Sequence, residues 1–441
     1  MFGRRALLGG AAALFASRAS LARGRPPVGG SAQLRVPWPL ASLDPHQLDD
    51  VGCAIFGGSL FDSLYAFEDN RVVPALAETM PEPVGNGARV RLRAGLTSAR
   101  GRPIGVREVV SSLARARAGD ARAWLVDVAS PWRADALSLH FPNVDAQKLA
   151  SFLASPLTAI VAADFSPALP DATGGFAARH EAGALVLARN ERAATGGAFL
   201  DTLLVRQAVD LADSLRSFEA GTDDVGWLGS GLHEPRAGAR PFDAGAVGWV
   251  LLRTGRDAGS WDTPGVAQRL ADGISPSLLA HLAPGPAWTV EPDQGWGGPP
   301  CELLVRDDSP YLAEVARAVA AALTRASHEV TVRQVPAATF RQRRASRSYA
   351  LAIDVARPFA PGLLGSLAAL ATSDDPERAR DAVRYPPRRG DMSPRTIART
   401  LHVGVICEIR VQGGRVPALA LPARSSGGVD WAGATRTRRV P

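Results

Sequence analysis

The sequence predicts an α/β fold organised in two lobes, and three observations support this. The chain has 441 residues, which is too long for one compact core and suits two lobes. Val90 and Leu92 alternate with arginines, as in a half-buried strand, whereas apolar residues in 106–113 follow helical spacing. Residues 302–335 then have the order strand, helix, strand. Alternating strands and helices predict the α/β class.

The N-terminus has the features of an export signal. Arg4 and Arg5 precede an apolar stretch at 6–16, and Ser20-Leu21-Ala22 forms a small-x-small cleavage site. We expect residues 1–22 to be a signal peptide that is cleaved near Ala22, which predicts a periplasmic location. The paired arginines favour the twin-arginine route, and the Sec route stays open.

The charge distribution does not favour nucleic-acid binding. The chain carries a formal net charge of +7, to which the predicted leader contributes three arginines. The remaining arginines are scattered, apart from short clusters at 341–344 and 436–439, and no known DNA-binding motif accompanies them. We expect the 341–344 cluster to be a solvated face, and nucleic acid is not an expected partner.

In the first half of the chain, a first strand is expected at 33–36. An apolar, aromatic segment follows at 60–67. Helices are expected at 106–113, 145–154 and 211–218, and strands at 89–93 and 184–189.

In the second half, a strand is expected at 247–252 and one or two helices at 266–282. Ser309 is a plausible N-cap, with Pro310 in the first turn of the helix that follows it. This helix connects strands at 303–305 and 330–332, which predicts a right-handed parallel crossover. A further strand is expected at 349–355, and the chain is expected to return to the first part of the fold around 403–409.

The order of several short motifs resembles the family 5 solute-binding proteins of ABC importers, the peptide- and nickel-binding group. Leu43-Asp44-Pro45-His46 is followed by an apolar, aromatic segment, an alternating strand and an amphipathic helix, in the order of that family's N-terminal lobe. The resemblance implies a two-lobed periplasmic-binding-protein-like fold (type II), with discontinuous lobes and an interlobe ligand cleft. Lobe I would comprise residues 32–245, with 403–441 returning to it, and lobe II residues 246–402.

The resemblance also implies a position for ligand recognition. In the peptide-binding members, an aspartate after a strand of the second lobe receives the ligand's amino group. Asp354 occupies the matching position here, and Pro358 retains the family's proline. Arg357 replaces the family's second aspartate, and the family's preceding tryptophan is absent. Asp354 is therefore either an amine anchor or the partner of Arg357 in a local salt bridge, whereas an Arg357 that faced the cleft would favour an anionic ligand.

The predicted ligand-binding residues are Asp354, Arg357, Tyr65, Trp38 and Phe359. Aromatic side chains suit the walls of such a cleft. An alternative for Tyr65 and the nearby Phe67 is that they pack in the core of the lobe.

The predicted function is capture of a small solute, a peptide by family default, and its delivery to an inner-membrane ABC permease by a monomeric binding protein. Because the cleft motifs are eroded, the alternative is a sensor or interaction module without transport. The seven histidines are dispersed, and no nucleophile elbow, P-loop or dinucleotide fingerprint is present. Carboxylate pairs such as Asp49-Asp50 fall in turns, where solvated carboxylates are common. We therefore expect neither an enzyme nor a bound cofactor or metal.

Three cysteines, Cys53, Cys301 and Cys407, cannot all pair within one chain. Export permits a disulfide between Cys301 and Cys407, and buried free thiols are the equal alternative.

Overall fold

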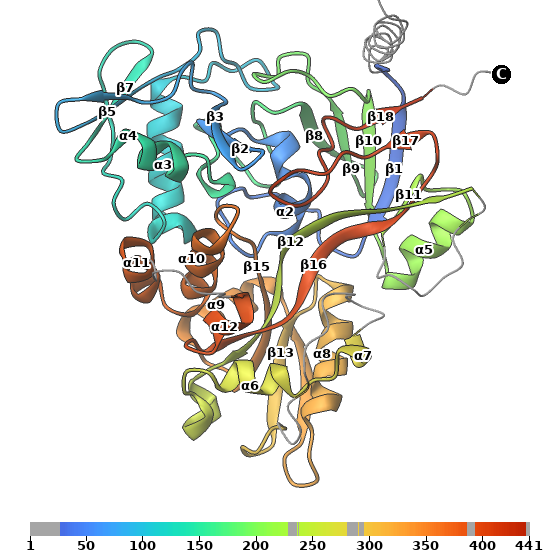
Figure 1. Cartoon of the computed structure of the whole chain (residues 1–441). Helices are drawn as coiled ribbons and strands as arrows, with labels where there is room; N and C mark the ends of the chain where they lie inside the picture. The colour runs from blue at the N-terminus through green and yellow to red at the C-terminus, as the bar shows by residue number, and fades with distance from the viewer. Residues whose placement is uncertain are drawn as a thin grey trace, which may run out of the picture.

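The computed structural model describes residues 27–227, 236, 238–279, 290, 295–385 and 393–437. A ten-stranded mixed sheet runs through the molecule in the order β14-β13-β15-β12-β16-β11-β1-β10-β9-β8 (Figure 1). Its strands are β1 (Ser31–Val36), β8 (Phe176–Glu181), β9 (Ala184–Arg189), β10 (Thr202–Gln207), β11 (Val225–Trp227), β12 (Arg240–Thr254), β13 (Cys301–Arg306), β14 (Val330–Val335), β15 (Leu351–Ala356) and β16 (Val403–Arg415). The predicted leader lies outside the described residues.

Two long antiparallel strands, β12 and β16, connect the two ends of this sheet. β12 has 15 residues and β16 has 13, and they pair with each other along most of their length. Register shifts interrupt the pairing between Asp243 and Ala246, between Ala246 and Gly248, and between Val250 and Leu251. We call the part of the molecule around β1 and β8–β11 the first lobe, and the part around β13–β15 the second lobe. The lobe boundaries predicted from the sequence stay a prediction.

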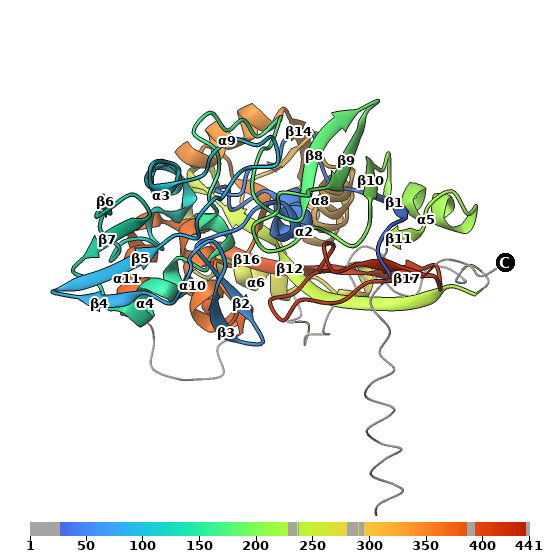
Figure 2. The same ribbon diagram turned by 90° about the horizontal axis from the view of Figure 1, so that it is seen from above.

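The first lobe adds three small sheets and several helices to its end of the large sheet (Figure 2). Its further elements are α2 (Val51–Leu60), β2 (Tyr65–Glu68), β3 (Arg71–Pro74), β4 (Glu82–Val84), β5 (Gly87–Arg91), α3 (Val106–Ala118), η1 (Asp120–Arg122), β6 (Trp132–Arg133), β7 (Ser138–Pro142), α4 (Ala146–Phe152), η2 (Pro156–Thr158), α5 (Leu211–Glu219), β17 (Leu419–Ala420) and β18 (Thr435–Arg436). The helices expected around 106–113, 145–154 and 211–218 are confirmed as α3, α4 and α5. Sequence analysis did not predict α2.

The second lobe contains the predicted strand–helix–strand unit. β13 and β14 are parallel, and α8 (Pro310–Leu323) connects them. The Ser309 hydroxyl accepts a hydrogen bond from the Leu312 N–H at 3.4 Å, so Ser309 is the N-cap that the sequence predicted. The other helices of this lobe are η3 (Arg256–Trp261), α6 (Val266–Asp272), α7 (Pro276–Leu279), α9 (Ala337–Ser346), α10 (Leu363–Asp374), α11 (Pro376–Arg384) and α12 (Pro394–Ala398). Residues 280–282 of the helical stretch predicted at 266–282 lie outside the described part.

The two largest clusters of buried apolar side chains lie on opposite faces of the central sheet. Val250 and Leu252 of β12 belong to one cluster, and Trp249 and Leu251 to the other, because successive side chains of a strand point to opposite faces. Each cluster includes side chains from both lobes. The first joins α2 to α8, and the second joins α3 to α10. The lobes therefore pack against each other on both faces of the sheet.

After β16 the chain returns to the first lobe and completes its core. Trp431 is fully buried, and its ring lies 5.5 Å from that of Phe56 on α2. Its indole N–H donates to the Ile55 carbonyl at 3.1 Å. Within the described residues, none of the helices combines the length and the apolar character needed to cross a membrane.

Candidate functional site

Asp354 lies in β15 at the centre of a buried ionic network. Its side chain is on the same face of the sheet as that of Arg253 on the neighbouring β12, and one Asp354 oxygen accepts from the Arg253 guanidinium at 2.9 Å. The other oxygen accepts from the Val355 N–H at 2.9 Å. Only 2% of Asp354 is exposed. Burial acts to raise the pKa of Asp354, but Arg344 and Arg253 outweigh it and hold that pKa below its usual range.

Arg344 on α9 connects this network to the first lobe. Its Nη1 atom lies 2.8 Å from an oxygen of Asp49 and 3.5 Å from an oxygen of Asp354. Burial would lower the pKa of the Arg344 guanidinium, but Asp49, Asp354 and Asp120 raise it above its ordinary value. One guanidinium thus lies between a carboxylate of each lobe.

Asp120 is a further carboxylate of the first lobe close to Arg344. It accepts the Leu48 N–H at 2.7 Å. Burial raises the pKa of Asp120, whereas the charge of Arg344 acts to lower it. The network therefore includes two acidic side chains from the first lobe that face one arginine of the second.

Arg357 does not form the local salt bridge with Asp354 that the sequence left open. Its guanidinium donates to the carbonyls of Gln47, at 3.1 Å, and Pro45, and its backbone N–H donates to the Leu48 carbonyl at 3.1 Å. All three acceptors belong to the turn that precedes α2 in the first lobe. Arg357 thus fastens the second lobe to this turn.

The turn is held in place by α3. Arg115 donates to both carboxylate oxygens of Asp44, at 2.8 and 2.6 Å, and to Nδ1 of His46 at 2.7 Å. Because Arg115 donates to Nδ1, the ring proton is on Nε2, which donates to the Ala159 carbonyl at 2.8 Å. Burial and the Arg115 charge lower the pKa of His46 to about 4. The hydrogen bonds of Arg115 and His46 therefore position the carbonyl groups that accept from Arg357.

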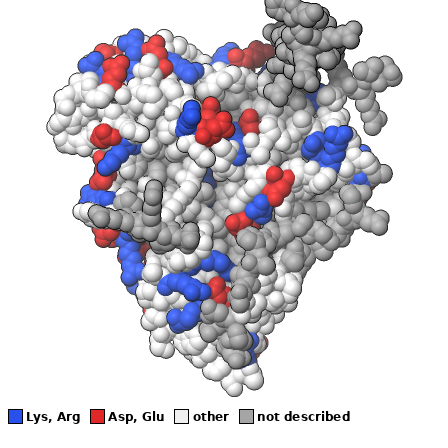
Figure 3. All heavy atoms as spheres, in the orientation of Figure 1, with Lys and Arg blue, Asp and Glu red and all other residues white. Residues whose placement is uncertain are grey.

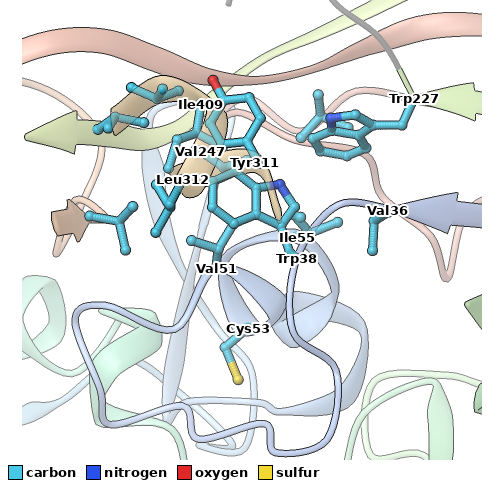
Figure 4. Packing of buried hydrophobic residues seen from close by; sticks show 14 of the residues in the cluster. Val36, Trp38, Val51, Cys53, Ile55, Trp227, Val247, Tyr311, Leu312 and Ile409 are labelled. Carbon is cyan, nitrogen blue, oxygen red and sulfur yellow. The ribbon is translucent and has the colours of Figure 1, made fainter. Parts of the chain in front are cut away.

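Two of the predicted aromatic residues lie at contacts between the lobes. The Trp38 ring packs against Tyr311 of α8 with 4.7 Å between ring centroids, among apolar side chains of both lobes (Figure 4). The indole nitrogen of Trp38 is buried and has no hydrogen-bond partner among the described residues. Phe359 is fully buried and stacks on Trp124 of the first lobe at 5.3 Å, with 9° between the rings.

Tyr65 lies away from the ionic network, in the core of the first lobe. It is fully buried in β2, and its hydroxyl donates to the Thr79 carbonyl at 3.3 Å. Its neighbour Phe67 is half-buried and packs against the same core. A role in ligand binding stays a prediction for all five candidates: Asp354, Arg357, Tyr65, Trp38 and Phe359.

Sequence analysis missed two important members of the network. The 341–344 cluster was expected to be a solvated face, but Arg344 is half-buried and paired with two aspartates. Asp49 was expected to be a solvated turn carboxylate, and only 4% of it is exposed. Both expectations were wrong, because a partner some 300 residues away along the chain leaves no local signal. On the face shown in Figure 3, basic and acidic side chains are interspersed.

The described residues show no disulfide and no metal centre. Cys53, Cys301 and Cys407 are all free thiols, so the alternative of a Cys301–Cys407 bridge is not realised. Within the described parts of the chain, no three His, Cys, Asp or Glu side chains are arranged to hold a metal ion.

Comparison with known proteins finds similarity in structure only. No family model matches the chain, and none of the curated proteins matches it in sequence. Among solved structures, the pheromone receptor PrgZ, described with its mode of peptide binding, superposes with a TM-score of 0.71 at 14% identity. The match covers 93% of this chain and 100% of PrgZ. The chain has a solute-binding-protein fold.

Two further structures support the same fold. The oligopeptide-binding protein AppA from Bacillus subtilis, solved with a nonapeptide, gives a TM-score of 0.71 at 13% identity over 94% of this chain and 100% of AppA. NikA from Staphylococcus aureus, in complex with Ni(L-His)2, gives 0.67 at 15% identity over 92% of this chain and 100% of NikA. The two-lobed α/β fold class predicted from the sequence is confirmed.

Proposed function

We propose that this protein is the solute-binding component of an ABC importer. It captures a small solute between its lobes and delivers it to an inner-membrane permease. The similarity to binding proteins over almost the whole chain is the observation that carries this proposal. Two lobes connected by β12 and β16 also suit opening and closing around a solute. The role is binding rather than catalysis.

The finer parts of the proposal follow from the sequence. Residues 1–22 direct export to the periplasm, where the protein acts as a monomer. The lobes comprise residues 32–245 with 403–441, and residues 246–402. A peptide is the default solute, and Asp354, Arg357, Trp38, Tyr65 and Phe359 remain the proposed contacts. Most of them lie between the lobes in the closed arrangement, so solute access requires the lobes to separate.

A second candidate function is a sensor or interaction module that does not transport. The observation that favours it is the completeness of the contacts between the lobes. The polar groups of Asp354 and Arg357 already have partners within the chain, and Trp38 and Phe359 have aromatic neighbours. Because these contacts already hold the lobes together, no solute is required to bridge them.

A thermal-shift screen of the chain from Arg23 onward tests the first proposal. The panel contains di- to oligopeptides, amino acids, nickel chelates and small anionic solutes. A solute that binds only the folded state stabilises it by about 2.7 kcal/mol at a hundredfold excess over Kd. A concentration-dependent rise in Tm supports solute capture, whereas the absence of any rise across the panel favours the second candidate.

The variant Asp354→Asn tests the proposed contact, because it keeps the shape of the side chain and removes its charge. Loss of the thermal shift, with circular dichroism unchanged, supports Asp354 as a binding residue. A shift that persists in this variant supports solute capture and excludes Asp354 as an essential anchor. Glu191→Gln, at an exposed site in the first lobe, is the matched control.

A further inference from the structure

We propose that Arg344 is a latch that holds the two lobes closed when no solute is present. The inference goes beyond the proposed function and rests on it in one respect, because it concerns the closure that solute capture requires. It attributes to a side chain of the protein the bridging role that a solute would otherwise have.

The charges around Arg344 come from both lobes. Asp49 and Asp120 belong to the first lobe, and Asp354 to the second, yet the Arg344 guanidinium is the one cation within 4.0 Å of both Asp49 and Asp354 among the described residues. Separation of the lobes would leave Asp49 without its 2.8 Å ion pair. If Arg344 is instead replaced while the lobes stay together, Asp49 keeps a buried charge without its partner, which is strongly destabilising.

The hydrogen bonds beside Arg344 lie next to one another along the chain, so we expect them to break together when the lobes separate. The Arg357 N–H donates to the Leu48 carbonyl across the lobes, and the Leu48 N–H donates to Asp120. Asp49, the next residue, is the partner of Arg344. The backbone hydrogen bond at Arg357 therefore reports directly on the state of the latch.

While Arg344 holds this position, both carboxylate oxygens of Asp354 have partners within the chain and are not available to a cationic group of a solute. One of its oxygens faces Arg253 and Arg344, and the other accepts the Val355 N–H. A cationic group on a solute would reach Asp354 only after Arg344 has moved away. The latch thus couples the entry of such a solute to the separation of the lobes.

Hydrogen exchange of the solute-free protein, read by NMR at the Arg357 amide, tests the proposal. We expect this amide to be protected in the wild type, and to exchange at least about tenfold faster in Arg344→Gln, because the variant leaves the buried Asp49 carboxylate without its ion pair across the lobes. The Cys301 amide, which donates to Glu329 within the second lobe, is the internal control for general unfolding.

Two further variants keep the test decisive if Arg344→Gln folds poorly. Asp49→Asn removes only the partner in the first lobe and should also accelerate exchange at Arg357. Arg343→Gln changes a neighbouring arginine of α9 that has no ion pair within the described residues, and should leave the exchange unchanged. Equal protection at Arg357 in the wild type, Arg344→Gln and Asp49→Asn would overturn the latch, because apolar packing alone would then hold the lobes together.

The readout uses no solute, so its outcome is separate from that of the solute screen. If Arg344→Gln accelerates exchange at Arg357 and no solute of the panel raises Tm, the second candidate function is favoured and the inference stands. If a solute raises Tm but the Arg357 amide of the wild type exchanges freely, solute capture is supported and the latch is overturned.

Discussion

Protonation of His46 should destabilise the protein at acidic pH, and His46→Gln should lack this loss. The buried ring accepts from Arg115 at Nδ1 and donates from Nε2 to the Ala159 carbonyl. A second ring proton would have to be placed on Nδ1, against the Arg115 guanidinium. Glutamine is neutral at all accessible pH values, and its amide nitrogen can donate to the Ala159 carbonyl in place of Nε2.

The magnitude follows from the difference in pKa between the two states. The pKa of His46 is about 4 in the folded protein and 6.5 in the unfolded chain. The unfolded chain therefore binds the proton first as the pH falls. The stability contributed by the neutral ring is fully present above pH 6.5 and is lost as the pH falls towards 4. Linkage gives a loss of about 2 kcal/mol at pH 5 relative to pH 8.

Asp50, four residues away, acts in the opposite direction. Burial raises its pKa from 3.8 to about 6. The folded state then binds this proton more tightly, so its contribution is greatest below pH 3.8 and is lost as the pH rises through 6. This gain of about 1 kcal/mol at pH 5 partly hides the His46 effect in the wild type. The contribution of His46 is therefore isolated by comparing the wild type with His46→Gln, because Asp50 is present in both.

Urea unfolding of the wild type and His46→Gln at pH 8 and pH 5 provides that comparison. We expect the difference in the free energy of unfolding to shift by about 2 kcal/mol in favour of the variant at pH 5. His180→Gln, at an exposed position on β8, is the control and should show no such shift. The same difference at both pH values would refute the assignment of the proton to Nε2 and the repulsion by Arg115.

Three more predictions concern the second lobe and the thiols. Ser309→Ala removes the N-cap of α8 and should lower the free energy of unfolding by about 1 kcal/mol in urea titrations; an unchanged midpoint would contradict it. Gly404→Ala should cost about 1–3 kcal/mol, because the new Cβ would lie 2.4 Å from the Ala267 carbonyl oxygen, and thermal unfolding at an unaltered Tm would count against this. Burial raises the pKa of the Cys53 thiol, and it raises the pKa values of the Cys301 and Cys407 thiols to about 11 and about 12. Thiol reagents should therefore label all three cysteines only after denaturation; a single labelled thiol in the denatured protein would instead indicate a disulfide.

Local sequence patterns predicted α3, α4, α5, α8 and several strands, but not α2 or α9–α12. The helix α8 has an apolar stripe and a Ser–Pro start, both of which are visible within a few residues. In α2, from Val51 to Leu60, eight of ten residues are buried, so the polar face that makes a helix recognisable is absent. Its cap, in which the Asp50 carboxylate accepts the Cys53 N–H, was read only as part of a turn.

The sequence pointed to one member of the buried ionic network. The resemblance identified Asp354, but its partners Arg253 and Arg344 come from a neighbouring strand and a separate helix. Such pairs depend on sheet register and helix packing, which a single sequence does not specify. The sequence suggested Arg357 as a local salt-bridge partner of Asp354, but its guanidinium donates instead to carbonyl groups of the first lobe.

The return of the chain after β16 affects the order in which the protein is built during translation. Trp431 completes the apolar core around α2, although some 370 residues separate it from Phe56. A nascent chain on the ribosome thus carries an unfinished first lobe until Trp431 has been added. Translation that stopped before residue 419 would leave a space the size of an indole ring beside α2. The second lobe, whose strand–helix–strand unit is contiguous, has no such requirement and is free to fold first.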